Sequence, residues 1–268
     1  MNSRSRPRIM GILNVTPDSF SDGGLYYSGG AVEHALEMVE AGADYIDIGG
    51  ESTRPGSDPV LPEEQIRRIV PVIKELAPVT DVPISVDTMD AKVARAALDA
   101  GADIINDVNG LRSEGMMELA SSAGVPVVIM HMNGEPKTMQ IHPMEGSVVG
   151  EIAAFLKERC DTAKEYGIKD IILDPGIGFG KTVAQNMEII ENVSSFSFGC
   201  PVLIGASRKR FLSEIYPGTD RDEATVRVSL KAIGHGADIV RVHNVGMMVN
   251  ALKEEFGNGS EGQDRHQR

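Results

Sequence analysis

Short apolar runs alternate with amphipathic stretches along most of this chain. The runs predict eight strands, at residues 8–14, 44–49, 83–87, 103–107, 126–131, 170–174, 201–206 and 238–242. Between the runs, apolar residues recur at helical spacing, as at Ile66, Ile69, Ile73 and Leu76, or at Val148, Ile152, Phe155 and Cys160. This alternation predicts an α/β protein with a parallel sheet whose strands are connected by helices.

One seven-residue pattern occurs three times. Ala-Gly-Ala-Asp-Tyr-Ile-Asp ends at Asp47, Ala-Gly-Ala-Asp-Ile-Ile-Asn ends at Asn106, and His-Gly-Ala-Asp-Ile-Val-Arg ends at Arg241. In each copy the glycine suits the end of a helix, and the apolar residues suit a strand that is buried on both faces. Eight such units without a break in composition favour a single-domain (β/α)₈ TIM barrel, although an open doubly wound sheet remains an alternative.

The ends of the chain differ from this regular region. We expect one catalytic domain over residues 8–256, a flexible N-terminus over residues 1–7, and a disordered tail over residues 257–268. The tail is polar, rich in glycine and free of aromatic residues, so it offers little apolar surface to bury.

Composition limits the classes of function. The formal net charge is −13, which argues against a surface that binds nucleic acid phosphates. No apolar run is long enough to span a membrane and no secretory signal is evident, so we expect a cytoplasmic protein. The two cysteines, Cys160 and Cys200, fit neither a disulfide framework nor a metal cluster, and we expect both to be inert thiols in the core.

Polar residues follow nearly every predicted strand. They are Asn14, residues 49–54, Asp87, Asn106 with Asp107, His131, Asp174, residues 207–209 and residues 241–243. In a TIM barrel the carboxyl ends of the strands meet at one mouth, where the catalytic residues lie. Helix capping would explain Asp87 or Asp107 taken singly, but it does not call for the cations Lys209, Arg241 and His243.

The glycine-rich segment 174–182 resembles a phosphate-binding loop at first sight. Only three residues separate Gly176 from Gly180-Lys181, whereas the P-loop template requires four. We therefore expect a flexible loop after the sixth strand, with Phe179 available to lie against a flat ligand. Metal-ligand patterns are weak, because His131 and His142 lack partners at ligand spacing.

The motifs at the strand ends resemble those of dihydropteroate synthases in order and spacing. They are residues 11–24, residues 47–56, Ser-Val-Asp-Thr at 85–88, Met-His-Met at 130–132, residues 174–181, Ser-Arg-Lys at 207–209 and Arg-Val-His at 241–243. The resemblance implies a transferase of folate biosynthesis that condenses 6-hydroxymethyl-7,8-dihydropterin diphosphate with 4-aminobenzoate. It also implies Mg²⁺ as cofactor and a homodimer.

The resemblance assigns roles to particular residues. It implies that the pterin binds to Asp87, Asn106, Met130, Asp174, Gly205 and Lys209, and that Asn14, Arg241 and His243 hold the diphosphate. Asn14 would also be the ligand to Mg²⁺. Thr53, Arg54, Pro55, Phe179 and Ser207 would border the aminobenzoate, and the catalytic residues would be Asp87, Asp174, Lys209, Arg241 and His243. The first loop, residues 16–24, would cover the diphosphate.

Asn133 and Ile177 depart from the residues common in that family, as does the stretch 140–146, and these departures concern specificity and loop behaviour. Two alternatives stay open at this point. One is a folate-dependent methyltransferase domain with a similar pterin pocket, and the other is a pterin-binding protein without turnover. The exact arylamine and the response to sulfonamides are also open.

Overall fold

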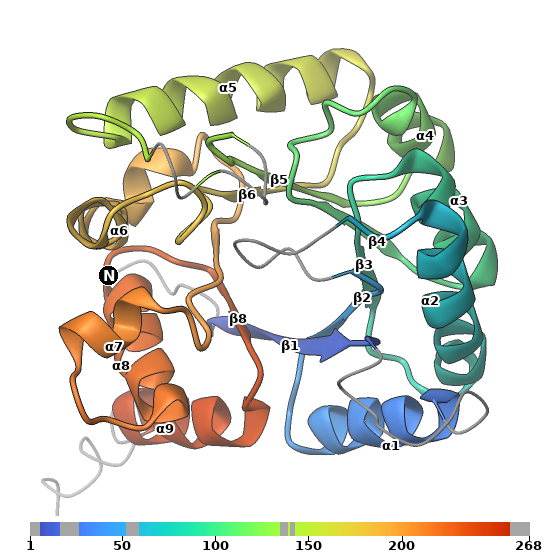
Figure 1. Ribbon diagram of the computed structural model, residues 1–268, viewed down its shortest axis with the longest axis horizontal. Coiled ribbons are helices and arrows are strands. Elements are labelled where there is room, and N and C mark those ends of the chain that lie inside the picture. Colours follow the sequence, from blue (N-terminus) through green and yellow to red (C-terminus); the bar gives the residue numbers. More distant parts are fainter. Residues whose placement is uncertain (1–5, 17–26, 52–58, 135–138, 140–142, 258–268) are drawn as a thin grey trace, which may run out of the picture.

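All eight predicted strands are present in the structure, a computed structural model that describes residues 6–16, 27–51, 59–134, 139 and 143–257 (Figure 1). They are β1 (Arg8–Asn14), β2 (Tyr45–Gly49), β3 (Ile84–Asp87), β4 (Ile104–Asp107), β5 (Val127–Met130), β6 (Ile171–Asp174), β7 (Leu203–Ile204) and β8 (Ile239–Val242). The strands match the predicted positions to within a residue or two at each end. β7 is the shortest, and Pro201 at its predicted start has no N–H with which to extend the ladder.

Helices surround the strands on all sides (Figure 1). They are α1 (Tyr27–Glu40), α2 (Pro62–Leu76), α3 (Ala91–Ala100), α4 (Met116–Ala123), α5 (Val149–Glu165), α6 (Val183–Glu191), α7 (Phe211–Ile215), α8 (Arg221–Gly234) and α9 (Val245–Gly257), with 3₁₀ turns η1 (Ala77–Val79) and η2 (Val193–Phe196). Local sequence explains several ends. The Asp90 side chain caps α3, Thr182 and Gln185 form a capping box on α6, and Gly101 ends α3 with φ +113°.

The sheet closes on itself, which decides between the two predicted architectures in favour of the barrel. Parallel ladders join β6 to β5 and so on through β1, β8 and β7, with Arg8 paired to Ile239 where the first and last strands meet. A single bridge between Leu173 and Val202 connects β6 to β7, and the Leu173 N–H donates to the Pro201 carbonyl at 2.9 Å. We call this narrow junction the β6–β7 seam.

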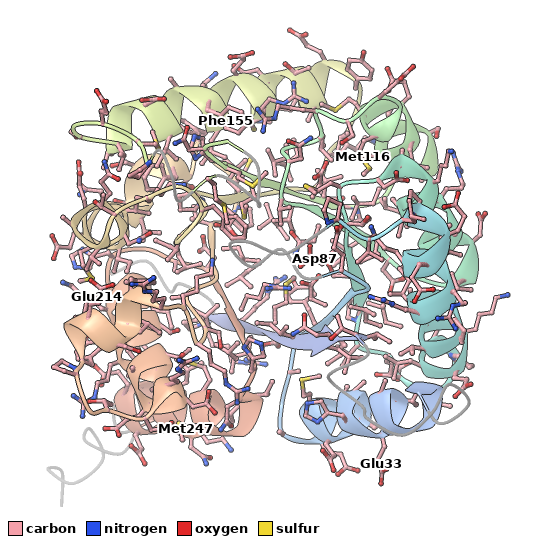
Figure 2. The ribbon with its side chains drawn as sticks, in the orientation of Figure 1. Glu33, Asp87, Met116, Phe155, Glu214 and Met247 are labelled. Atoms are coloured by element: carbon pink, nitrogen blue, oxygen red, sulfur yellow. The ribbon has the colours of Figure 1, made fainter. Side chains whose placement is uncertain are left out.

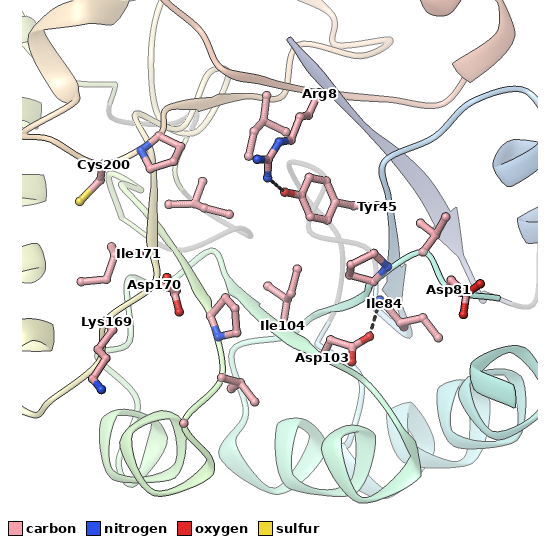
Figure 3. A pocket seen from close by; sticks show the side chains of 18 of the residues that line it. Arg8, Tyr45, Asp81, Ile84, Asp103, Ile104, Lys169, Asp170, Ile171 and Cys200 are labelled. Atoms are coloured by element: carbon pink, nitrogen blue, oxygen red, sulfur yellow. Dashed lines mark hydrogen bonds between the residues drawn. The ribbon is translucent and has the colours of Figure 1, made fainter. Parts of the chain in front are cut away.

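The threefold sequence pattern has a structural role at the amino ends of the strands. Its aspartates are Asp44, Asp103 and Asp238, and their Oδ2 atoms accept hydrogen bonds from the backbone N–H groups of Ile9, Ile84 and Val202 at 2.8, 2.9 and 2.9 Å. The bond between Asp103 and Ile84 is visible in Figure 3. Each aspartate therefore binds the strand next to its own and helps to fix the register between them.

Most buried apolar side chains lie in two regions of the barrel. The main core lies between the strands and the helices, and a smaller group fills the barrel interior near the amino ends of the strands. That inner group consists of Met10, Tyr45, Ile104, Val128, Ile172, Leu203 and Ile239. Outside it, at the amino-terminal mouth, lies a cavity of about 760 Å³ that includes Arg8 and Tyr45 (Figure 3). The barrel is thus a packed core and not a pore.

The expectation for the cysteines is only half right. Cys160 on α5 is fully buried, but Cys200 is partly exposed, and the two Sγ atoms lie 3.6 Å apart. The sequence pattern could not show this contact because 40 positions separate the two residues. Among the described residues, no helix is long and apolar enough to cross a membrane.

Candidate active site

The interior of the barrel is apolar near the amino ends of the strands and polar near their carboxyl ends. Six of the seven inner apolar residues, all except Met10, are followed two positions later by a site residue, which lies on the same face of the strand and nearer the opposite mouth. Tyr45 is followed in this way by Asp47, Ile104 by Asn106, Val128 by Met130, Ile172 by Asp174, Leu203 by Gly205 and Ile239 by Arg241. Six strands thus present their predicted or candidate site residues at one end of the barrel.

The centre of this mouth is a cluster formed by Asp47, Asp87, Asn106 and Arg241, which we call the central cluster. Asp47 Oδ2 accepts from Arg241 Nε at 2.6 Å and from Asn106 Nδ2 at 3.0 Å. Arg241 Nη2 donates to Asp87 Oδ2 at 2.8 Å. Asp87 lies inside the ring of strands, whereas Glu33, Glu214 and Met247 lie on outer helices (Figure 2). Four strands are therefore joined by charged and amide groups in a buried site.

The loop after β6 forms a second side of the mouth. Asp174 Oδ1 accepts from the Gly176 N–H at 2.7 Å, and Lys209 donates to the Ile177 carbonyl. The Lys209 ammonium lies 4.3 Å from the centre of the Phe179 ring, a cation–π contact. Gly178 makes this approach possible, because a Cβ at that position would lie 2.8 Å from Lys209 Cδ.

This loop is largely buried. Phe179 is only 8% exposed, and the side chain of Lys181 turns inward beneath the loop. Lys181 Nζ donates to the carbonyls of Gly176 and Phe179 at 2.8 and 3.0 Å and lies 3.1 Å from His131 Nδ1. The three hydrogens of an ammonium group thus meet three acceptors. His131 thus belongs to a buried hydrogen-bonded group beneath the loop.

A third group of polar side chains lies where β1, β7 and β8 end. Ser207 Oγ lies 2.8 Å from His243 Nδ1 and accepts from the His243 backbone N–H at 3.1 Å. Asn14 Nδ2 lies 3.5 Å from His243 Nε2. Ser207 therefore fixes the orientation of the imidazole, and His243 presents its other nitrogen toward Asn14.

Burial governs the ionisation of these groups. It raises the pKa of Asp174, against the opposing effects of the Gly176 N–H and the Lys209 ammonium. Burial also raises the pKa of Asp87, an effect that Arg241 opposes and Asp47 strengthens. It lowers the pKa of Lys209 to about 7, although Asp174 favours the charged form. The mouth therefore holds charges that are costly without a ligand, which is typical of a functional site.

Several buried oxygens in this mouth accept no hydrogen bond from the described residues. They are Asp47 Oδ1, Ser85 Oγ and Asp87 Oδ1, and all three belong to the neighbouring strands β2 and β3. A buried carboxylate oxygen without a donor is costly, so the site suits a ligand that brings N–H groups to it. The geometry favours a flat, nitrogen-rich ring bound beside a group that the cations can attract.

The predicted site residues that the structure describes all come together at this mouth. They are Asn14, Asp87, Asn106, Met130, Asp174, Phe179, Gly205, Ser207, Lys209, Arg241 and His243. Met130 and Phe179 belong to one apolar cluster, and Gly205 lies against Arg241. Thr53, Arg54 and Pro55 lie outside the described residues, as do residues 17–24 of the first loop and His142.

Sequence reasoning missed Asp47, which holds the central cluster together, and Lys181. A signal for Asp47 was present, because Asp47, Asn106 and Arg241 are the last residues of the three copies of the repeated pattern. Equivalent positions on parallel strands lie at equivalent heights in a barrel. Superposing the copies would have placed Asp47 beside two residues already assigned to the site.

Comparisons with known proteins agree with this geometry. A family model described as "Pterin binding enzyme" matches residues 10–243. The dihydropteroate synthase of Synechocystis sp. is 44% identical over 256 residues, which cover 92% of this chain and 89% of that protein.

Solved structures give the same result. Xanthomonas albilineans dihydropteroate synthase with 4-aminobenzoic acid has a TM-score of 0.88 and 44% identity, covering 95% of this chain and 94% of the other. The same organism's enzyme in complex with 7,8-dihydropteroate has a TM-score of 0.84 and 41% identity, with the same coverage of both chains. The chain therefore belongs to the pterin-binding enzymes, and within that family to the dihydropteroate synthases.

Proposed function

We propose that this chain condenses 6-hydroxymethyl-7,8-dihydropterin diphosphate with 4-aminobenzoate at the carboxyl-terminal mouth of its barrel. The observation that carries the proposal is the central cluster. Buried acceptors on β2, β3 and β4 lie beside Arg241, and Lys209 and His243 complete a basic border. Relatives with 4-aminobenzoic acid or 7,8-dihydropteroate bound support the choice of substrates.

The pterin ring would occupy the space between the central cluster and Asp174. Its exocyclic amine and ring N–H groups need acceptors, which Asp174 and the unpartnered Oδ1 atom of Asp87 offer. Asn106 would supply an amide for both kinds of hydrogen bond, and Lys209 would donate to the ring oxygen and nitrogen acceptors. Gly205 would leave room for the flat ring, and Met130 would pack against its face.

The diphosphate would lie beside Asn14, Arg241 and His243. Arg241 pairs with two carboxylates of the ring pocket, Asp47 and Asp87, and would also contact the diphosphate. Ser207 would keep His243 aimed at the diphosphate through its contact with Nδ1. Phosphate sites near the last strands recur in this fold, and the carboxyl end of β8 is such a position.

Magnesium fits this side of the site through a single protein ligand. Asn14 offers a side-chain amide oxygen, and no group of three or more His, Cys, Asp or Glu in the described ranges could hold a metal. Mg²⁺ often binds through few protein groups when phosphates and water supply the other oxygens. When bound, it would neutralise charge on the departing diphosphate.

The aminobenzoate would bind against Phe179 and Ser207, with Thr53, Arg54 and Pro55 as further contacts. Phe179 now lies beneath the Lys209 ammonium, so both substrates would meet at this point of the mouth. The amine nitrogen would form a bond to the pterin methylene carbon as the C–O bond to diphosphate breaks, and the amine would lose one proton to water. The carboxylates of Asp87 and Asp174 favour the positive charge that spreads into the ring.

A turnover assay tests the proposal. Purified protein with Mg²⁺, pterin diphosphate and 4-aminobenzoate should release diphosphate and form dihydropteroate, and omission of the amine should largely suppress release. Binding of the pterin without product would favour a silent binder, and methyl transfer from a folate would favour a methyltransferase. A small panel of arylamines would identify the preferred amine.

Two further properties belong to the proposal. We expect a homodimer, and light scattering coupled to size-exclusion chromatography would contradict this by giving the mass of one 28.8 kDa chain. We also expect the protein to act in the cytoplasm, which subcellular fractionation checks.

A further inference from the structure

The two cysteines form a contact that the active site does not use. Cys160 Sγ on α5 lies 3.6 Å from Cys200 Sγ, in the segment between η2 and β7. The S–S distance of a disulfide is about 2.0 Å, so bond formation would bring the sulfurs closer by only about 1.5 Å. Chain segments 40 positions apart thus already hold their thiols close to bonding distance.

The backbone around Cys200 keeps its thiol in this place. The Cys200 N–H donates to the Ser197 carbonyl at 2.6 Å, and Ser197 Oγ donates to the Cys200 carbonyl at 2.8 Å. Phe198 and Gly199 complete the turn with φ values of +43° and +81°. A turn bonded at both ends holds one sulfur against the other, and Cys160 on the long helix α5 is fully buried.

A small oxidant has a route to this pair. Cys200 is partly exposed and lines the cavity of about 760 Å³ at the amino-terminal mouth of the barrel (Figure 3). Burial and the neighbouring Cys160 raise the pKa of Cys200 to about 11, so its thiol is protonated near neutral pH and reacts slowly.

We propose that Cys160 and Cys200 are an oxidative modification site that closes to an intramolecular disulfide when hydrogen peroxide is present. The Cys200 thiolate attacks the peroxide, which gives sulfenic acid and hydroxide. The Cys160 sulfur then displaces water from that sulfenic acid, so two thiols and one peroxide become one disulfide and two waters. A thiol reductant such as dithiothreitol reverses the step.

The bond would reinforce the weakest connection of the barrel. Cys200 lies just before Pro201 and Val202, and these two residues make the backbone contacts of the β6–β7 seam with Leu173. The disulfide would attach this seam to α5 and would restrict the unfolded chain. Because the catalytic groups lie at the other mouth, turnover should stay the same whichever state the cysteines are in. The inference is therefore independent of the proposed reaction.

Mass spectrometry and thermal unfolding test the proposal together. Peroxide treatment of the full chain should yield a dithiothreitol-sensitive peptide pair linking Cys160 to Cys200 and an intact mass lower by about 2 Da, the two hydrogens lost on oxidation. The midpoint of thermal unfolding should rise by about 5 °C or more, as expected for a cross-link of this loop length. Dithiothreitol should reverse both changes.

Cys200→Ser is the matched control, because this partly exposed position tolerates a hydroxyl better than the buried Cys160. The variant should show neither the cross-link nor the rise in midpoint under peroxide. Oxygen addition at Cys200 without a Cys160 link would overturn the proposal, and so would disulfides between separate chains only. A cross-link that forms without any rise in midpoint would overturn the inferred stabilisation of the seam.

Discussion

Replacing Asp47 with alanine tests how far the central cluster depends on one buried carboxylate. The change removes the bond from Arg241 at 2.6 Å and the bond from Asn106 at 3.0 Å. Both bonds are accepted by a carboxylate, and a hydrogen bond to a charged group contributes about 1.5 kcal/mol or more. If both bonds position groups for the transition state, kcat/KM should fall roughly hundredfold, the equivalent of about 3 kcal/mol.

Folding should survive the Asp47→Ala change, because Arg241 keeps its pairing with Asp87 at 2.8 Å and is not left as an isolated buried charge. Diphosphate release measured at limiting pterin diphosphate gives kcat/KM, and differential scanning fluorimetry reports the folded state. Asp47→Asn keeps the shape and one acceptor, so we expect a smaller loss of roughly tenfold, for one weakened charged bond.

Asp103→Ala is the matched control for this experiment. Asp103 also accepts a backbone hydrogen bond, from the Ile84 N–H at 2.9 Å, but this aspartate is exposed and lies at the opposite end of the barrel. Its loss should lower the free energy of unfolding and leave kcat/KM unchanged. A folded Asp47→Ala enzyme with the wild-type kcat/KM would refute the role given to the central cluster.

Three further predictions concern the mouth and the loop after β6. The pKa of Lys209 is about 7, and the ammonium donates more strongly to the pterin than the neutral amine does, so pterin affinity should fall as pH rises above about 7. Calorimetric titration from pH 6 to 9 checks this, and a flat profile in the wild type would contradict it. Gly176→Ala should destabilise the fold by roughly 3 kcal/mol or more, because the new Cβ would lie 1.8 Å from the His131 carbonyl oxygen. In the control variant Gly167→Ala the new Cβ meets no atom within 4 Å, so the loss should be about 1 kcal/mol. Urea unfolding compares the two variants, and equal losses would exclude the clash. Lys181→Met removes three hydrogen bonds and should lower the free energy of unfolding by about 3 kcal/mol, which urea unfolding would measure. Because Lys181 holds the loop that carries Phe179, the variant should also raise the KM for 4-aminobenzoate in steady-state kinetics. An unchanged KM would mean that Lys181 does not position Phe179.

The sequence predicts the strands of this barrel well because each is a buried apolar run followed by polar residues, and a glycine precedes six of the eight. The closure of the sheet into a barrel could not be predicted from the sequence, since it depends on the seam contact between Leu173 and Val202. The second helix between β7 and β8 also went unpredicted. The short α7 offers too few turns for a helical period to stand out.

The candidate site was predicted less completely than the fold. Strand ends show which residues reach the mouth, but contacts across the barrel depend on side-chain length and direction. Asp47 reaches both Asn106 and Arg241 only because three strands place them at one height. Lys181 looked like part of a failed phosphate motif, and nothing in its neighbours indicated that it turns inward to meet His131.

The aspartates that bind neighbouring strands have a consequence for how this enzyme can change over time. Asp44, Asp103 and Asp238 secure strand alignment from the end of the barrel that faces away from the chemistry. Insertions or substitutions in the loops around the substrates therefore leave these three hydrogen bonds intact. Selection by new amines or inhibitors can therefore change the loops without disturbing the alignment of the strands.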